Sequence, residues 1–321
     1  MVQVDLITGF LGAGKTTFLR RYIRYLLAQG HNVCILENDF GAVNVDALLL
    51  QDLLGERCDL ETISGGCDCD THQRRMRTKL ISLAMRGFDR VVVEPSGIFD
   101  VDEFFDLLRD DPLDRWYQIG SVFSIVDALL PASLSPQAEY LLASESAHAG
   151  TVLFSRSQLA SDEQKAAALA HLEQALARCK CSRRFAPEEL WFRDWDTLTD
   201  AELSALERAG HRPASFEKLH FDEHDAFASL CFLEHGLSGK ALCEAAQELF
   251  AAAHCGHILR VKGFAPAPDG WLELNATAAG QTTARLEQGQ EVLIVIHRAV
   301  ADARLLANPA SRSRVADSDP N

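Results

Sequence analysis

The sequence lacks any apolar run of about 18 residues, the length that would indicate a membrane-spanning helix. It is also poor in positive charge, with 31 Lys and Arg against 46 Asp and Glu and a formal net charge of −15. A nucleic-acid partner is therefore not expected, because phosphate backbones require a basic surface. No apolar leader precedes the first strand pattern, so we expect no signal peptide and a cytoplasmic location. Nine cysteines, an odd number, then indicate reduced thiols or metal ligands rather than a disulfide framework.

The phosphate-binding motif G-x-x-x-x-G-K-[ST] is present in full at Gly9–Thr17, which reads GFLGAGKTT. It follows an apolar run at 2–7 and precedes a helical pattern at 16–29, which is the context that the motif needs. Glycines let successive backbone N–H groups point at phosphates, and a helix that begins at Lys15 offers its positive dipole end to the same anion. The Lys15 ammonium can reach the β- and γ-phosphates, and the Thr16 hydroxyl can ligate Mg²⁺. The chain is thus predicted to bind a nucleoside triphosphate with Mg²⁺ through Gly9, Gly12, Ala13, Gly14, Lys15, Thr16 and Thr17.

Strand and helix patterns alternate through the first two thirds of the 321 residues. Strands are predicted at 2–7, 33–37, 90–94, 120–126 and 151–154, and helices at 16–29, 71–86, 137–147 and 161–178. Apolar strands with helical crossovers indicate a parallel sheet covered on both faces, with functional residues beyond the carboxyl ends of the strands. The predicted fold class is α/β, with a P-loop NTPase domain and a mainly parallel sheet over 1–204.

The rest of the chain is predicted to form a second, smaller domain. The polar stretch 205–225 is expected to be a linker. Strands at 226–233, 257–264, 270–276 and 291–296 and a helix at 238–253 indicate a small α+β domain with an antiparallel sheet over 226–300. The tail over 301–321 is rich in Ser, Arg, Asp and Pro and is expected to be disordered.

Acidic residues close two of the predicted strands. The second strand leads into Glu37-Asn38-Asp39-Phe40-Gly41, and Asp46 follows. Although such a segment can be an ordinary polar loop, in a P-loop fold a switch segment crosses the nucleotide here, and Asp39 or Asp46 can hold Mg²⁺ directly or through water. A third apolar strand ends at Glu94 and continues to Gly97. Glu94 is therefore predicted beside Mg²⁺ and the γ-phosphate, which the Gly97 amide can contact.

Two thiols lie close together in the turn-forming stretch Gly66-Cys67-Asp68-Cys69-Asp70. Thiolates with a carboxylate suit Zn²⁺, which takes sulfur and oxygen ligands tetrahedrally. The pair alone cannot close a site, so Glu37, Asp70, His72 or another residue would have to complete it. An isolated C-x-C pair is otherwise explained as two small turn residues. The second pair, Cys179–Cys181, lies among basic residues and is predicted to be structural or incidental.

Together, these motifs resemble the CobW-like family of the UreG/HypB-type metallochaperone GTPases, over nearly the whole chain. The matching segments are the P-loop at 9–17, the switch segment at 37–46, Glu94–Gly97, Ser124–Ala128, and Arg260–Phe264 with Trp271 behind it. The resemblance implies GTP hydrolysis coupled to handling of Zn²⁺ or Co²⁺, with a metalloprotein client. It also implies that Glu37, Cys69 and Asp70 converge on one divalent ion, with Cys67 as a further candidate ligand.

The chain departs from this family at two motifs. Asp70 stands where the signature G-C-x-C-C has its last cysteine, and a carboxylate is a harder ligand than a thiolate. After the strand 151–154 the family carries N/T-K-x-D, whose aspartate accepts two hydrogen bonds from guanine, whereas this chain has Ser155-Arg156-Ser157-Gln158. Ser155, Arg156 and Gln158 are still expected to bind the nucleotide. Guanine selectivity should nevertheless be weakened or lost, because the Gln158 amide cannot reproduce that acceptance.

Two functional hypotheses follow. In the first, the protein hydrolyses a nucleoside triphosphate and handles a metal: Lys15 and backbone amides stabilise the transferring phosphoryl group, and Glu94 orients the water shell of Mg²⁺. Thr16 and either Asp46 or Asp39 hold that Mg²⁺. In the alternative, the protein is a nucleotide-binding regulator or scaffold with little turnover and no metal transfer. A small-molecule P-loop kinase is a weaker third hypothesis, since no acceptor-binding lid is evident.

Overall fold

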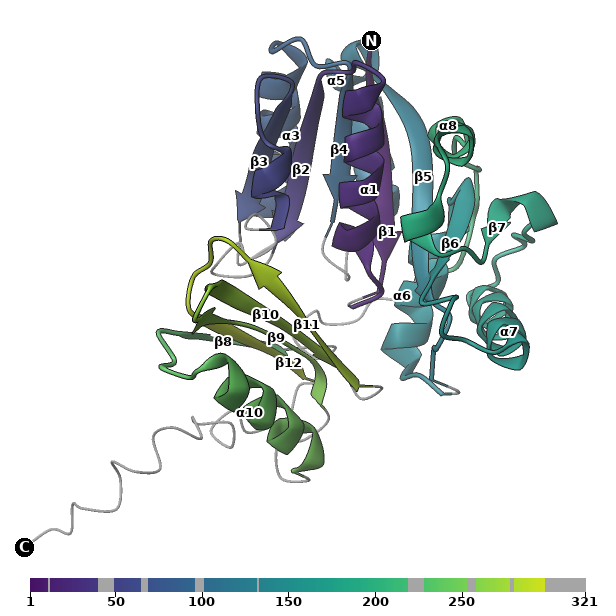
Figure 1. Cartoon of the computed structure of the whole chain (residues 1–321). Coiled ribbons are helices and arrows are strands. Elements are labelled where there is room, and N and C mark those ends of the chain that lie inside the picture. The colour runs from purple at the N-terminus through teal and green to yellow at the C-terminus, as the bar shows by residue number, and fades with distance from the viewer. Residues whose placement is uncertain are drawn as a thin grey trace, which may run out of the picture. The chain divides into compact units, whose positions relative to one another are not determined.

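In the computed structural model of this chain, the described residues are 1–10, 12–39, 49–64, 69–95, 101–131, 133–218, 228–252, 258–277 and 280–297. The chain divides into two compact units, Met1–Leu219 and His220–Asn321. Figure 1 labels most of the helices and strands of both. Among the described residues, none of the helices has the length and apolar character that crossing a membrane requires.

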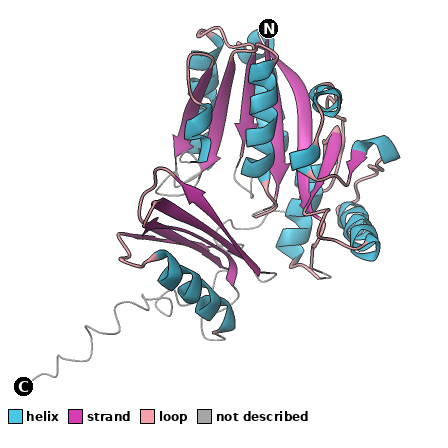
Figure 2. Ribbon diagram, viewed as in Figure 1, coloured by secondary structure: helices cyan, strands magenta, loops and turns pink. Residues whose placement is uncertain are grey.

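The first unit contains a seven-stranded sheet whose strands alternate with helices (Figure 2). The strands are β1 (Val2–Gly9), β2 (Val33–Asp39), β3 (Cys58–Ser64), β4 (Arg90–Glu94), β5 (Tyr117–Asp127), β6 (Thr151–Ser155) and β7 (Leu190–Trp191). The helices are α1 (Lys15–Ala28), α3 (Cys69–Ala84), α4 (Val101–Arg109), α5 (Leu113–Trp116), α6 (Pro136–Ala147), α7 (Asp162–Arg178) and α8 (Asp200–Glu207), with short 3₁₀ turns η1 (Gln51–Leu53), η2 (Pro187–Glu189) and η3 (Trp195–Thr197). The strand order is β3-β2-β4-β1-β5-β6-β7, and each of these pairings is parallel. The predicted α/β class with a mainly parallel sheet is confirmed.

Helices cover both faces of this sheet. On β4, the Val92 side chain packs with residues of α1 and α8, whereas Val91 and Val93 pack with residues of α3, α4 and α5. Helix α1 lies in front of the sheet in Figure 1. Helices α6 and α7 pack on Val152 and Phe154 of β6, the face opposite α1. Every residue of β4 and β6 is buried, as expected for apolar strands of a parallel sheet.

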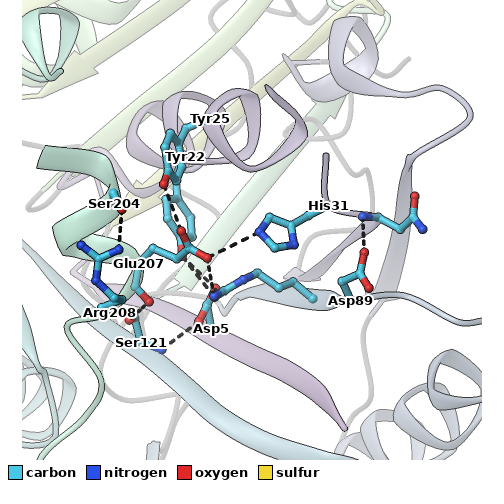
Figure 3. A network of polar contacts seen from close by, with 11 residues as sticks. Asp5, Tyr22, Tyr25, His31, Asp89, Ser121, Ser204, Glu207 and Arg208 are labelled. Carbon is cyan, nitrogen blue, oxygen red and sulfur yellow. Dashed lines mark hydrogen bonds and ion pairs between the residues drawn. The ribbon is translucent and has the colours of Figure 1, made fainter. Parts of the chain in front are cut away.

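A buried polar network fixes α1 and α8 to the amino-terminal halves of the central strands (Figure 3). Asp5 of β1 is fully buried, and its carboxylate accepts hydrogen bonds from Tyr22 Oη at 2.9 Å, Arg90 Nη1 at 2.6 Å and the Ser121 amide at 2.7 Å. Arg90 Nη2 donates to Glu207 Oε1 of α8 at 2.7 Å. Burial raises the pKa of Asp5 above its usual value, and the Arg90 guanidinium opposes this effect. The network therefore links five elements, β1, α1, β4, β5 and α8, through ion pairs and hydrogen bonds.

The second unit is a five-stranded antiparallel sheet with one helix packed on it. Its elements are β8 (Ala228–Leu233), α10 (Gly239–Ala251), β9 (Ile258–Ala267), β10 (Gly270–Thr277), β11 (Gly280–Leu286) and β12 (Val292–His297), and the strand order is β11-β10-β9-β12-β8. The Ser238 hydroxyl caps α10 by accepting from the Ala241 amide at 3.3 Å. Leu242 and Ala246 of α10 pack on Val261 of β9, so this helix and sheet share one core. The predicted antiparallel α+β arrangement is confirmed for this region.

Three strands, three helices and one connecting segment differ from the sequence-based expectation; the helices that were not predicted are α4, α5 and α8. Strands β3, β7 and β11 were not predicted, and β11 carries no alternation of buried and exposed residues that could have marked it. The stretch 205–218, expected to be a linker, contains the end of α8 and remains attached to the first unit. Leu206 is buried, and the Gly210 carbonyl accepts from the Val122 amide at 2.9 Å. The tail 301–321 lies outside the described residues.

Candidate nucleotide-binding site

The loop between β1 and α1 leaves the first amides of α1 without a side-chain cap. Gly14 occupies the N-cap position with φ of 107°, no side-chain hydrogen bond caps this helix, and its first turn contains no acidic residue. By contrast, Ser135, Ser161, Thr199 and Ser238 cap the later helices α6, α7, α8 and α10. Because uncapped amides and the helix dipole attract negative charge, the beginning of α1 is built for an anion.

Glycine is required where β1 enters this loop. Gly9 has φ of 140°, and a Cβ atom placed there would lie 2.4 Å from the carbonyl oxygen of Ile125 in the neighbouring strand β5. Gly12 and Gly14 also have positive φ values of 78° and 107°. A side chain at Gly9 would therefore push the loop away from the end of the sheet, in addition to the backbone strain.

Two side chains of the loop region reach toward the ends of the central strands. The Lys15 ammonium is 8% exposed and donates to the Gly9 carbonyl at 2.7 Å. The Thr16 hydroxyl donates to Glu94 Oε1 at 2.8 Å, and Glu94 is the last residue of β4. The register of β2 and β4 places Glu37 opposite Glu94, so two buried acids lie side by side at the carboxyl ends of adjacent strands. Thr16, Glu94 and Glu37 are thus brought to one edge of the sheet.

The segment that follows β6 folds back over the loop. Arg156 has a positive φ of 55°, its Nη2 donates to the Gly12 carbonyl at 3.0 Å, and its Nη1 pairs with the carboxylate of Asp127. Ser155 is buried, whereas Gln158 is exposed. Arg156 and Ser155 therefore lie beside the P-loop, and nucleotide binding by them stays a prediction.

Trp195 lies beside the same loop and was not identified from the sequence. A Cβ atom placed on Gly14 would lie 3.3 Å from the Trp195 ring and 3.6 Å from the Ser155 side chain. The indole also packs edge-on against Phe18 of α1, with ring centroids 5.5 Å apart. A lone tryptophan after a two-residue strand belongs to no periodic pattern. Its position beside the loop could therefore be seen only in the structure.

Several predicted site residues lie outside the described residues. These are Asp46, Cys67 and Gly97, together with the side chains of Asp39, Cys69, Asp70 and His72. Within the part of the chain that the structure describes, no group of three His, Cys, Asp or Glu side chains could hold a metal ion. The backbone nevertheless pairs Asp39 at the end of β2 with Ser64 at the end of β3, and helix α3 begins at Cys69. The strand that carries Glu37 and the strand that precedes the two cysteines therefore end side by side.

The second cysteine pair is part of the core. Cys179 and Cys181 are both buried among the apolar residues that α6 and α7 contribute beside β6. Burial raises the pKa of the Cys179 thiol, and the nearby Cys181 adds to this effect. Neutral buried thiols of this kind act as small apolar side chains.

A parallel sheet with a glycine-rich loop between its first strand and first helix defines a P-loop nucleotide-binding protein. A family model described as "CobW/HypB/UreG, nucleotide-binding domain" matches residues 3–186, and the chain belongs to this family. The chain therefore carries the nucleotide-binding domain of that family, as the sequence motifs predicted.

Curated relatives with significant similarity include two zinc chaperones. The chain is 30% identical over 188 residues to zinc chaperone YjiA of Escherichia coli K12, which covers 55% of this chain and 54% of the relative. It is 35% identical over 134 residues to zinc chaperone YeiR of the same strain, with 40% of this chain and 39% of the relative covered. The match thus spans about half the length of these relatives or less. A solved structure, the Zn(II)-bound YjiA GTPase of E. coli, is 21% identical with a TM-score of 0.37 and covers 97% of this chain and 98% of its own.

Proposed function

We propose that this protein binds a nucleoside triphosphate with Mg²⁺ at the P-loop, hydrolyses it, and couples hydrolysis to the handling of a divalent metal, zinc or cobalt. The observation that supports this most is the 2.8 Å hydrogen bond from the Thr16 hydroxyl to Glu94, beside the uncapped beginning of α1. In this motif the hydroxyl is the group that can ligate Mg²⁺, and the hydrogen bond connects it with a carboxylate at the end of a strand. An ordinary glycine turn before a helix has no need of such a pair.

In the proposed mechanism, Lys15 and the amides of the loop bind the phosphates. The Lys15 ammonium exchanges the Gly9 carbonyl for phosphate oxygens, where it stabilises the charge that develops during phosphoryl transfer. Thr16 would hold Mg²⁺, with Asp46 or Asp39 as a further ligand, and Glu94 would orient its water shell. When bound, Mg²⁺ neutralises charge on the phosphate oxygens. These residues offer the hard oxygen ligands that Mg²⁺ requires.

The metal that is handled would bind at the cysteine turn. Cys67, Cys69 and Asp70, with Glu37, supply thiolate and carboxylate ligands suited to Zn²⁺. Two observations support this placement: the pairing of the ends of β2 and β3, and the description of the relatives YjiA and YeiR as zinc chaperones. Metal delivery to a metalloprotein client and a cytoplasmic location are parts of the same proposal.

The base would lie against Arg156, Ser155 and Gln158. Because Arg156 is held by Asp127 and the Gly12 carbonyl, its guanidinium is positioned before the nucleotide arrives. Gln158 offers one acceptor and one donor group, so it does not select guanine as an aspartate would. We therefore include GTP and ATP among the candidate substrates.

Phosphate release from GTP and ATP by the metal-stripped full chain, with and without Zn²⁺, tests the proposal. Lys15→Ala should lower the hydrolysis rate roughly a hundredfold or more, because it removes a donor to the transferring phosphoryl group. Lys165→Ala is the matched control, since Lys165 lies on α7 and pairs with the neighbouring Asp162. Hydrolysis that is unaffected by Lys15→Ala would contradict the NTPase assignment. Hydrolysis that Zn²⁺ leaves unchanged would favour the regulatory or scaffold function instead.

A further inference from the structure

Glu145 is a buried acid that the proposed mechanism does not use. It lies on α6, is 2% exposed, and neither carboxylate oxygen has a hydrogen-bond partner among the described residues. The other acid of this helix, Glu139, is similarly buried but has partners: its Oε1 lies 2.7 Å from His171 Nε2 and 2.9 Å from Arg178 Nη1. An ionised carboxylate without such partners is costly in the protein interior, so Glu145 requires an explanation.

The backbone of Glu145 is attached to the end of β1, where the P-loop begins. The Thr8 hydroxyl donates to the Glu145 carbonyl at 2.7 Å, and helix α6 packs against β1 and β5. Gly9 follows Thr8, and its carbonyl accepts the hydrogen bond from the Lys15 ammonium at 2.7 Å. Glu145 and Lys15 are therefore both tied to the last two residues of the same strand.

The charge of Lys15 acts on the Glu145 carboxyl group. Burial raises the pKa of Glu145 to about 8, and the positive charge of Lys15 opposes this rise. The other buried or half-buried charges on α6 and on the elements near it have their own partners. These are Glu139 with His171 and Arg178, His148 with Asp102, Asp127 with Arg156, Asp5 with Arg90, and Glu94 with Thr16. Among the described residues, Lys15 is thus the cation whose charge acts on Glu145.

We propose that Glu145 is the internal counter-charge of the P-loop lysine and takes up a proton when a triphosphate binds. This inference rests on the proposed function only in that a nucleotide must bind the loop. Phosphate oxygens attract the Lys15 ammonium and add negative charge. An ionised Glu145 would then no longer be stabilised by the positive charge of Lys15. The carboxylate then accepts a proton from solvent and becomes a neutral acid. Glu145 does not touch the nucleotide, and it acts as a positioning residue through Lys15.

Proton uptake has a consequence for affinity. Because binding and protonation are linked, nucleotide affinity should fall as the pH rises above the pKa of Glu145, by up to tenfold per pH unit for one proton. In Glu145→Gln the side chain keeps its shape and is permanently neutral, so this part of the pH dependence should disappear. Between pH 7 and pH 9 the variant should gain affinity relative to the wild type.

The experiment is calorimetric titration of the full chain with non-hydrolysable Mg–GTP and Mg–ATP analogues. Titrations at pH 8 in two buffers of different ionisation enthalpy give the number of protons taken up. The wild type and the matched control Glu139→Gln should take up more protons per nucleotide than Glu145→Gln, by up to about half a proton, because about half of Glu145 is already protonated at pH 8. Protons that belong to the nucleotide itself cancel in this difference. Equal proton uptake by the wild type and Glu145→Gln, with nucleotide still bound, would overturn the assignment of Glu145 and leave the proposed function intact.

A second measurement, on the nucleotide-free protein, tests the role of Glu145 separately from the proposed function. Since the folded pKa of Glu145 is raised, its contribution to stability is present below its unfolded pKa and lost as the pH rises toward about 8. The melting temperature of Glu145→Gln should therefore rise relative to the wild type between pH 5 and pH 8. A wild type that bound neither analogue in the calorimetric titration would contradict the proposed function. Melting temperatures of the wild type and Glu145→Gln that changed with pH in the same way would contradict the role of Glu145 as a counter-charge.

Discussion

At the scale of single residues, we expect Gln158 to determine how the base is selected. It is exposed at the end of the segment in which Arg156 and Ser155 reach the P-loop. A site built on paired hydrogen bonds discriminates strongly, because a mismatched base leaves polar groups unpaired. Gln158 lacks the second acceptor for such a pair, so we expect the wild type to prefer GTP over ATP only modestly.

The substitution Gln158→Asp should raise the preference for GTP over ATP roughly tenfold or more, since it restores an acceptor-only side chain. Competition of GTP and ATP against a fluorescent nucleotide measures this ratio. Gln118→Asp is the matched control, because Gln118 is also exposed but lies near the amino-terminal end of β5. A wild type that already favours GTP more than a thousandfold would show that another residue reads guanine.

Some residues of the candidate site could be predicted from the sequence and others could not, for physical reasons. Thr16 and Glu94 could be predicted together, because the P-loop that carries Thr16 follows β1, Glu94 ends β4, and parallel strands end at the same edge of a sheet. Trp195 could not, since nothing in a lone tryptophan indicates that it lies beneath a loop formed 180 residues earlier. Glu145 was concealed as well, because an acid in a helix normally marks an exposed position. The metal ligands Cys67, Cys69 and Asp70 stay a prediction.

At the scale of elements, the Asp5 network holds α8 to the sheet (Figure 3). Arg90 stands between two acids, and its guanidinium bonds to Asp5 and Glu207 at 2.6 Å and 2.7 Å. Its removal would leave the fully buried Asp5 without its cation. We therefore expect Arg90→Ala to lower the free energy of unfolding by about 3–5 kcal/mol.

Urea unfolding followed by circular dichroism measures this loss. Arg109→Ala is the matched control, because Arg109 forms an exposed ion pair with Asp106 three residues away on α4. Exposed pairs of this kind contribute about 0–1 kcal/mol. A loss from Arg90→Ala no larger than the loss from Arg109→Ala would show that the network does not stabilise the fold.

The strands differ in how clearly their hydrophobic pattern predicts them. β4 and β6 are fully buried and consist of apolar runs, so their pattern identified them directly. β11 pairs along its whole length with β10, yet six of its seven residues are exposed. Its strand conformation is set by hydrogen bonds to a neighbour rather than by its own hydrophobic alternation, and such strands escape pattern analysis.

At the scale of the whole molecule, the register of one sheet connects the nucleotide site with the proposed metal site. Glu37 lies opposite Glu94, whose carboxylate accepts from Thr16, and the strand of Glu37 continues to the pairing of Asp39 with Ser64. A metal held by Glu37 would therefore lie one strand away from Glu94, the acid proposed to orient the water shell of Mg²⁺.

This arrangement gives a last prediction about metal affinity. Asp70→Cys adds a third thiol to Cys67 and Cys69, and thiolate is a softer ligand than carboxylate, so Zn²⁺ affinity should rise on the order of tenfold, about 1.4 kcal/mol. Proton release on binding should also rise, because each thiol must ionise to bind. Competition with a chromogenic zinc chelator at pH 7 measures the affinity, and Asp106→Cys on the exposed face of α4 serves as the control for an added thiol. Equal Zn²⁺ affinity of Asp70→Cys and the wild type would show that residue 70 does not ligate the metal.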